Sequence, residues 1–319
     1  MTASLPEPEP SPSGWKQRLE TLLARSRAPT SRRIQLWVFG VAAVAFAIGA
    51  ALAIRDFPHT RQPHDYTFLV LVVLLGPPAV VTLNSIEFTL AAGLLSQKVR
   101  IGQAVRIAVL GTAANQLPVP GAVIVRTQAL ATGGAGYRRA LFANLAIGLA
   151  WIGTAFTMAG LLQFHGRVPA LGLGFAAAGI AMLVACERVV HRATEPGGPR
   201  FMAARIIATE TVLVIVQAVR LALVLHGFGI RVSPAQAVAL ALSAVLTSAL
   251  GIVPGGVGVR EALAAGIGPI VGLPASVSLI ATAFDRLADL AVIGLAAVVI
   301  TILTRRSSAR VDVRETRAG

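Results

Sequence analysis

A helix-breaking segment lies inside an apolar stretch in the last third of the chain. Residues 254–261 read Pro-Gly-Gly-Val-Gly-Val-Arg-Glu, so a helix must stop there and two charged side chains, Arg260 and Glu261, follow the break. In lipid, unpaired backbone groups are so costly that a broken helix survives only where protein or a water-filled cavity covers it. Charged side chains at membrane depth are costly as well and mark functional sites. The segment therefore predicts a site embedded in a membrane.

The composition is that of a polytopic, all-α membrane protein. Of 319 residues, 55% are hydrophobic and only 13% are charged, and the mean hydropathy is +0.74. A net charge of +14 raises the alternative of nucleic-acid binding, but the basic residues lie in tails and short loops, and three Trp and two Tyr provide no stacking platform. The single cysteine, Cys186, excludes an internal disulfide and a cysteine-rich metal site. We therefore expect no nucleic-acid partner, no metal and no cofactor.

Six apolar runs are long enough to cross about 30 Å of hydrocarbon, which takes about 20 helical residues. These predicted spans are 34–54, 66–96, 140–164, 168–186, 203–228 and 275–303. Two further apolar regions are interrupted hairpins, and their lengths leave open whether they are re-entrant or cross fully. The first hairpin is 101–119 with a return through Arg126 to the glycine-rich loop 133–136, and the second is 235–253 with 262–273. The membrane domain is then 34–304, between a disordered basic tail, 1–33, and a second tail, 305–319.

The distribution of Lys and Arg orients this domain. If each hairpin returns to the side that it left, 20 of the 28 basic residues share one side with both tails. The opposite side holds four (Arg55, Arg61, Arg167 and Arg231), and four lie at membrane depth (Arg126, Arg220, Arg260 and Arg286). Because cytoplasmic loops carry the excess of basic residues, both termini are expected in the cytoplasm and the protein in the plasma membrane.

This orientation makes the two hairpins enter from opposite sides, each between long spans. That is the plan of an inverted repeat, with a binding site near the midplane. Repeat 1 is about 66–164 and repeat 2 about 203–304. Their similarity is short but in register: the same three residues begin at Gln103 and at Gln236, and the segment 120–126 matches 254–260 at Pro, Gly, Val, Val and Arg. We interpret the two arginine-bearing breaks as halves of one membrane-embedded site.

The residues around the second break favour an anionic ligand. Gly255, Gly256 and Gly258 permit positive φ and leave room for a ligand near the backbone. A helix that starts after them directs its free N–H groups and positive dipole end at the break. Arg260 adds a guanidinium whose geometry fits phosphate oxygens. Glu261 would pair with an arginine or bind a cationic group; a buried Arg–Glu pair that only fixes packing is the alternative.

Other embedded polar residues could join the site. Asp285 and Asp289 share a helix face, and Arg286 either pairs with Asp289 or faces the cavity with Asp285 as its charge balance. The remaining charged residues, Glu87, Glu210 and Arg220, each need a partner on another helix. Asn115, before the first break, could hydrogen-bond a headgroup or cap a helix end.

No arrangement of side chains suggests catalysis. Ser243 and Ser248 have no histidine near them in sequence, and no carboxylates flank a histidine cluster that could bind a metal. We therefore do not expect an enzyme.

The segment 254–261, together with Phe284-Asp285-Arg286 downstream, resembles the transmembrane domain family of lysylphosphatidylglycerol synthases. That family also contains stand-alone integral membrane proteins of unknown role. The first half resembles the family through Asn115, Pro118, Gly121 and Arg126 but lacks the acidic residue often found before that arginine. The resemblance covers about residues 35–304 and implies a flippase-like domain without the soluble aminoacyl-transferase domain.

The expected function is a lipid flippase or translocase, for aminoacylated or other phosphate-bearing lipids. Arg126 and Arg260 would bind the lipid phosphate with help from Arg286, while Glu261 and Asp285 would set charge balance or headgroup choice. One alternative is a non-transporting subunit that scaffolds a lipid-modifying enzyme, and another is an intramembrane transferase acting on a lipid-linked substrate. The expected partners are membrane phospholipids, with a lipid-modifying enzyme and a second copy of the chain as further candidates.

Overall fold

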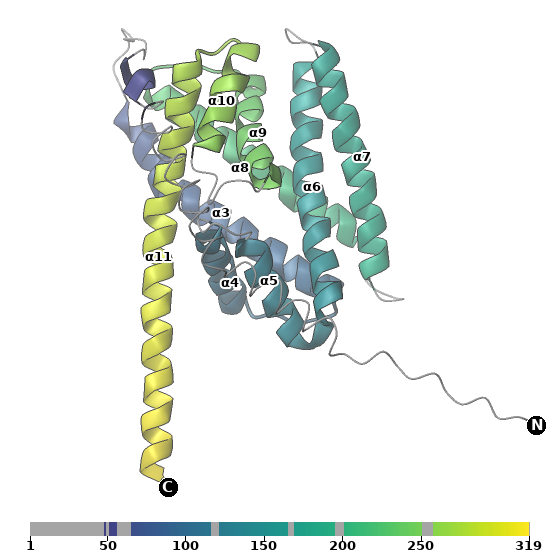
Figure 1. Cartoon of the computed structure of the whole chain (residues 1–319), viewed down its shortest axis with the longest axis vertical. Helices are drawn as coiled ribbons and strands as arrows, with labels where there is room; N and C mark the ends of the chain where they lie inside the picture. The colour runs from purple at the N-terminus through teal and green to yellow at the C-terminus, as the bar shows by residue number, and fades with distance from the viewer. Residues whose placement is uncertain are drawn as a thin grey trace, which may run out of the picture.

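The computed structural model describes residue 48 and residues 51–55, 65–115, 121–164, 169–194, 201–250 and 258–318. Within these ranges the chain is built of helices, turns and short connections, with no β-strand. The predicted tail 1–33 lies outside the described residues, as does most of the predicted span 34–54. Figure 1 shows the described helices assembled into one bundle.

The described helices coincide closely with the other five predicted apolar runs. They are α3 (Tyr66–Leu94), α4 (Ile101–Ala114), α5 (Gly121–Leu130), the π-helical turn η1 (Ala131–Ala135), α6 (Tyr137–Gln163), α7 (Pro169–Ala193), α8 (Met202–Gly227), α9 (Pro234–Leu250), α10 (Val259–Ile270) and α11 (Ala275–Ala318). The largest differences from the prediction are at two helix ends. Helix α7 continues past Cys186 to Ala193, and α11 continues through most of the predicted tail 305–319.

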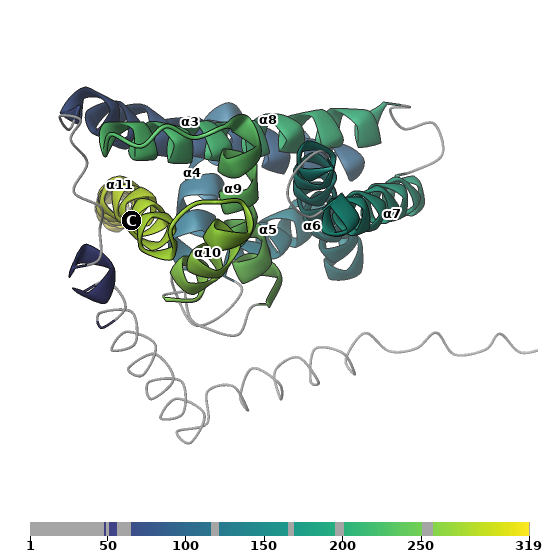
Figure 2. The ribbon, with the colours of Figure 1, turned by 90° about the horizontal axis from the view of Figure 1, so that it is seen from above.

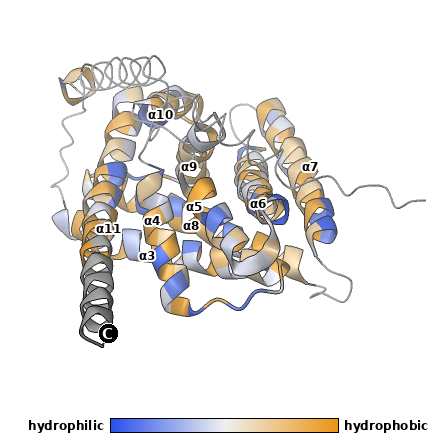
Figure 3. Ribbon diagram, turned by 60° about the horizontal axis from the view of Figure 1, so that its bottom comes forward, coloured by the Kyte–Doolittle hydropathy of each residue, from blue (hydrophilic) through white to orange (hydrophobic). Residues whose placement is uncertain are grey.

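Four described helices are long and apolar enough to cross a membrane, namely α3, α6, α7 and α8. They have 25 to 29 residues, and the mean hydropathy of their most apolar windows is 1.8 to 2.1. Many of their large apolar side chains face outward, and Figure 3 shows hydrophobic residues running along α6 and α7. An outward-facing apolar surface is stable when lipid surrounds it. The chain is therefore an all-α membrane protein.

The helices of the two interrupted hairpins are short. Helices α4, α5 and α10 have 14, 10 and 12 residues, so at 1.5 Å per residue they are about 21, 15 and 18 Å long. Each is shorter than the hydrocarbon core. Figure 1 shows α4 and α5 in the lower half of the bundle and α9 and α10 in the upper half. A long, short, short, long order of helices thus occurs twice, in α3–α6 and in α8–α11.

An amide side chain ties the two legs of each hairpin together. Nε2 of Gln97, just before α4, donates a hydrogen bond to the Leu130 carbonyl at the end of α5, at 2.9 Å. Nε2 of Gln236, in the first turn of α9, donates to the Val271 carbonyl after α10, at 3.0 Å. Gln236 also accepts a bond from the Ser233 backbone N–H at 2.8 Å, so it helps to cap α9. These bonds fix where each hairpin opens and closes.

Helices α3 and α8 lie side by side through much of the bundle (Figure 2). Both hydrophobic cores are built on them. One core joins α3, α6, α8, α9, α10 and α11, and the other joins α3, α4, α5, α6, α7 and α8. Helices α3 and α8 therefore connect the two parts of the bundle that hold these cores.

Helices α6 and α7 approach each other through glycines. A Cβ at Gly160 would collide with the backbone of Ala176, and a Cβ at Gly179 would collide with Thr157. Close approach of backbones through small residues is how helices associate in lipid, where no hydrophobic driving force joins them. This pair forms one flank of the bundle (Figure 1).

Candidate functional site

Helix α10 starts at the glycine that ends the second break. Gly258 has φ of +79°, in the left-handed region that favours glycine. Its carbonyl accepts the first helical hydrogen bond, from the Ala262 N–H at 2.9 Å. Arg260 and Glu261 therefore lie in the first turn of α10, where the dipole favours an acidic side chain. Gly255 and Gly256 lie outside the described residues.

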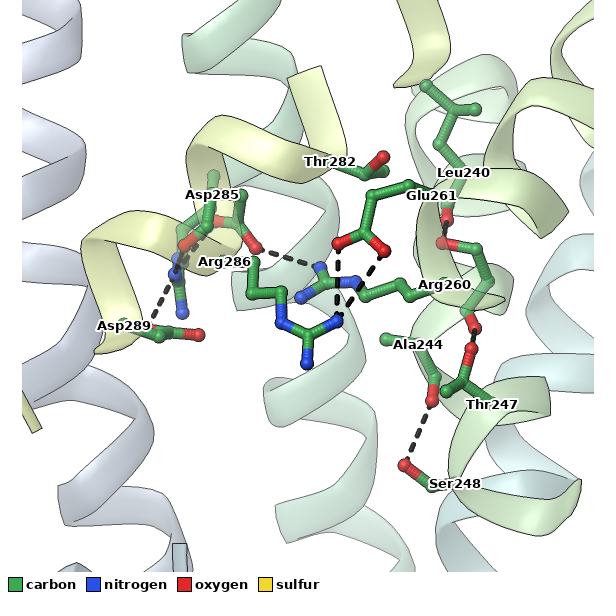
Figure 4. Close-up of polar contacts among 12 residues, drawn as sticks. Leu240, Ala244, Thr247, Ser248, Arg260, Glu261, Thr282, Asp285, Arg286 and Asp289 are labelled. Atoms are coloured by element: carbon green, nitrogen blue, oxygen red, sulfur yellow. Dashed lines mark hydrogen bonds and ion pairs between the residues drawn. The ribbon is translucent and has the colours of Figure 1, made fainter. Parts of the chain in front are cut away.

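Asp285 on α11 joins two arginines from two other helices. Nη2 of Arg260 donates to Oδ2 of Asp285 at 2.8 Å. Nη2 of Arg220, on α8, lies 2.7 Å from Oδ1 of the same carboxylate. Figure 4 shows Asp285 between α11 and α10, with its carboxylate directed toward Arg260. The carboxylate thus links α8, α10 and α11.

Two more ion pairs extend this arrangement. Arg220 also reaches Oδ1 of Asp289 at 2.7 Å and the Asp285 carbonyl at 3.3 Å. Nη1 of Arg286 lies 3.3 and 3.5 Å from the two oxygens of Glu261, as Figure 4 shows. Asp289 therefore pairs with Arg220, and Arg286 with Glu261.

We call these six residues the second-half cluster: Arg220, Arg260, Glu261, Asp285, Arg286 and Asp289. Three positive and three negative side chains balance, so the cluster is neutral when all are ionised. The side chains are buried or partly buried, from 1% exposure for Glu261 to 21% for Asp289. A buried charge is stable only with a partner, and the removal of one partner leaves the other uncompensated. The cluster can therefore rearrange at low cost only if a new ion replaces a lost partner.

A second cluster surrounds the arginine of the first hairpin. Nη1 of Arg126, on α5, donates to Oε2 of Glu87, on α3, at 2.9 Å. Glu210 on α8 is fully buried and interacts electrostatically with both. We call Glu87, Arg126 and Glu210 the first-half cluster. The acidic residue that the sequence lacks next to Arg126 is thus supplied from another helix.

The structure separates the two predicted arginines into these two clusters rather than gathering them into one. Glu210 and Arg220 are ten residues apart on α8, which corresponds to about 15 Å along the helix axis. Predicted residues Arg260, Glu261, Asp285 and Arg286 lie together in the second-half cluster, and Arg126 lies in the other. The first-half cluster joins α3, α5 and α8. The second-half cluster joins α8, α10 and α11.

Three arginines retain a buried donor. The Nε atoms of Arg126, Arg220 and Arg260 are shielded from solvent, and none has an acceptor among the described residues. Native proteins pair nearly all buried polar groups, so three unpaired donors in two clusters are unusual. A ligand that carries several acceptor oxygens would supply partners for them.

Asn115 has a structural function. Its side-chain Oδ1 accepts a hydrogen bond from the Ala122 backbone N–H at 2.8 Å, at the start of α5. This is the capping alternative, and it holds the two legs of the first hairpin together across residues 116–120. The same contact leaves the Asn115 amide nitrogen available to a ligand at the break.

For three contributing residues, Glu87, Glu210 and Arg220, the sequence indicates only a need for distant partners. A further signal lies in the register of the proposed repeat. The 133-residue offset that relates Gln103 to Gln236 also relates Glu87 to Arg220. Glu87 pairs with Arg126 in the first hairpin, and Arg220 pairs with Asp285 and Asp289 on α11, which follows the second hairpin. The two equivalent positions of the proposed repeat therefore carry opposite charges.

We compared the chain with protein-family models, curated proteins and solved structures, and none of them matches.

Proposed function

We propose that this protein is a lipid flippase or translocase whose two opposed hairpins form a pathway for phosphate-bearing headgroups. The observation that carries the proposal is the pair of short-helix hairpins in opposite halves of the bundle, each with a partly buried, ion-paired arginine after its break. Half-length helices that break inside protein are how many transporters expose backbone and charge to a substrate. In this proposal the hairpins are re-entrant, and the two repeats are inverted.

The chemistry of the two clusters suits a phosphodiester. Arg126 and Arg260 each commit one Nη to a carboxylate and keep an unpartnered Nε. Phosphate oxygens bind guanidinium groups in a fork, so they could occupy the Nε and displace the carboxylate from Nη. Glu87 and Asp285 would then act as internal substitutes for the ligand, and keep the arginines paired when no lipid is bound.

The carboxylates of the second-half cluster favour a headgroup that carries its own positive charge. Glu261 is buried, and its ion pair with Arg286 is the longest in the cluster, at 3.3 Å. A lipid ammonium could compensate Glu261 or Asp285 while the phosphate compensates Arg260. This preference agrees with the aminoacylated lipids that the family resemblance implies.

The proposal is tested by reconstitution of the purified full chain in liposomes that contain fluorescent phosphatidylglycerol. A membrane-impermeant quencher reports the fraction of label in each leaflet over time. We expect the wild-type protein to exchange the label between leaflets and Arg260→Ala to slow exchange about tenfold or more. Loss of a charge-assisted hydrogen bond costs about 1.5–3 kcal/mol, and about 1.4 kcal/mol corresponds to a factor of ten.

Arg231→Ala is the matched control, because Arg231 is exposed in the connection between α8 and α9. It removes the same charge without touching either cluster and should leave exchange unchanged. If the purified wild-type protein moves no lipid and Arg260→Ala changes nothing, the flippase proposal is wrong. Activity that appears only with a co-purified enzyme would favour the scaffold alternative.

A further inference from the structure

Glu210 is the most deeply buried carboxylate of the first-half cluster. It lies in the first half of α8, and its exposed fraction is 0%. Neither of its oxygens receives a hydrogen bond from a donor among the described residues. An ionised carboxylate accepts up to four hydrogen bonds and is costly to bury without them. The flippase pathway proposed above assigns no task to Glu210.

Another carboxyl, that of Glu87, interacts with Glu210. The side chain of Glu87 lies within hydrogen-bonding reach of it, and Glu87 is itself only 3% exposed. Two ionised carboxylates are both acceptors and cannot bond to each other. Their close approach in a buried place is stable when one proton lies between them, as in other proteins where two carboxyl groups share a site.

The surrounding charges do not remove this requirement. Arg126 from α5 is the cation that acts on both carboxyls, and it is committed to Oε2 of Glu87 at 2.9 Å. Cys186 from α7 also lies in the field of Glu210, but its thiol donates to the Ala146 carbonyl at 3.2 Å. Helix α9 carries no charged residue, and Asp285 and Asp289 of α11 pair with Arg220 and Arg260. Among the described residues, one cation therefore faces two acids.

A metal ion is a poorer occupant than a proton. No group of three or more His, Cys, Asp or Glu side chains gathers in the described ranges in a way that could hold a metal. One carboxylate of the pair is already occupied by a guanidinium, which would repel a cation. A proton needs only the two carboxyl oxygens, and it brings the net charge of the cluster from −1 to zero.

We propose that Glu87 and Glu210 form a proton-binding site in which one exchangeable proton is shared by the two carboxyl groups. The site is linked to the lipid pathway through Arg126. If a phosphate takes Arg126 from Glu87, the two acids still share one proton but carry one uncompensated negative charge. They then take up a second proton, which they release when Arg126 returns to Glu87. Lipid movement is then accompanied by proton movement, and this second step rests on the function proposed above.

Infrared spectroscopy of the purified full chain in phosphatidylcholine nanodiscs tests the proton site directly. A protonated, buried carboxyl gives a C=O stretching band that is distinct from the carboxylate bands and shifts in D₂O. We expect this band in the wild-type protein at neutral pH and its loss in Glu210→Gln. Glu187→Gln should keep the band, because Glu187 is an exposed carboxylate near the end of α7.

Thermal stability separates proton binding from a structural salt bridge. Glu210→Gln replaces a protonated acid by a neutral group of the same shape, so we expect the melting temperature to be unchanged or higher. A wild-type protein without the band, or a Glu210→Gln variant that retains it, would overturn the proton site. A large fall in the melting temperature of Glu210→Gln would likewise show that Glu210 is an ionised, paired carboxylate.

A pH gradient across the liposomes of the lipid assay tests the coupling. We expect an imposed gradient to change the direction or rate of lipid exchange in the wild-type protein but not in Glu210→Gln. If the gradient changes lipid exchange in neither the wild-type protein nor Glu210→Gln, the proposed coupling is wrong. Failure of the proton site is distinguishable from failure of the proposed function. A wild-type protein that exchanges lipid but lacks the infrared band contradicts only the proton site. A wild-type protein that shows the band but moves no lipid contradicts the flippase proposal.

Discussion

Arg126 and Glu87 are 39 residues apart in the chain, yet Nη1 of the arginine donates to Oε2 of the glutamate at 2.9 Å between α5 and α3. Their side chains are 11% and 4% exposed. The contact supplies in space the acidic partner that the sequence lacks next to Arg126. It also attaches the second leg of the first hairpin to α3, the longest of the four described helices that are long and apolar enough to cross a membrane.

Removal of either partner should destabilise the protein strongly. Arg126→Gln leaves Glu87 and Glu210 buried without a cation, and the loss of one partner of a buried ion pair costs about 3–5 kcal/mol. We expect the double variant Arg126→Gln/Glu87→Gln to recover much of that loss, since neither charge is then left alone. Thermal unfolding in detergent of the wild-type protein, both single variants and the double variant measures the coupling. Additive losses would contradict a direct pair.

The helices could be predicted well from the sequence because membrane spans are dictated by long apolar runs, and the helix ends differ mainly at α7 and α11. Arg260, Glu261, Asp285 and Arg286 could be predicted as neighbours, because charges are rare inside an apolar region, but Arg126, although predicted to join them, lies in the first-half cluster. The pairing of charges between helices could not be predicted. The link from Glu87 to Arg126, and that from Arg220 to Asp285, depend on how α3, α5, α8 and α11 pack, which no local pattern encodes.

Asp285 should be more important than Asp289 within the second-half cluster. Asp285 joins Arg220 to Arg260, whereas Asp289 pairs with Arg220 and is 21% exposed. Asp285→Asn leaves Arg260 without its carboxylate, so we expect at least about a tenfold loss of lipid exchange and a clear fall in melting temperature. Asp289→Asn is the matched control on the same helix. Equal effects of the two substitutions would show that the bridge is unimportant.

Gly76 should control the position of Arg220. A Cβ placed at Gly76, on α3, would lie 2.7 Å from Nε and 3.1 Å from Cδ of Arg220. Gly76→Ala therefore pushes the guanidinium away from Asp285 although it removes no charge. We expect impaired lipid exchange, while Gly148→Ala on α6, whose Cβ would meet nothing within 4 Å, should leave exchange unchanged. Full activity of Gly76→Ala would mean that Arg220 has no fixed position in transport.

Asn115→Ala tests whether the amide is more than a cap. Loss of the bond from the Ala122 N–H should cost about 0.5–2 kcal/mol of stability, the usual value for a helix N-cap. Asn115→Asp keeps an oxygen that can accept this bond but removes the amide donor and adds a negative charge. If the amide contacts a phosphate, Asn115→Asp should retain stability and slow lipid exchange. Equal exchange in the wild-type protein and Asn115→Asp would leave Asn115 with a capping function alone.

The opposed entry of the two hairpins is tested by cysteine labelling. Cys186 is buried and donates a hydrogen bond to the Ala146 carbonyl, so Cys186→Ser preserves a donor in the unlabelled background. Gly134 and Gly272 have φ of +102° and +82°, which a cysteine adopts poorly. The exposed neighbours Thr132 and Ala275 are better positions for the probe. With an impermeant maleimide on sealed cells, we expect Ala275→Cys to react from outside and Thr132→Cys to react only after the cells are opened. Labelling of both positions from the same side would remove the inverted arrangement on which the proposed pathway rests.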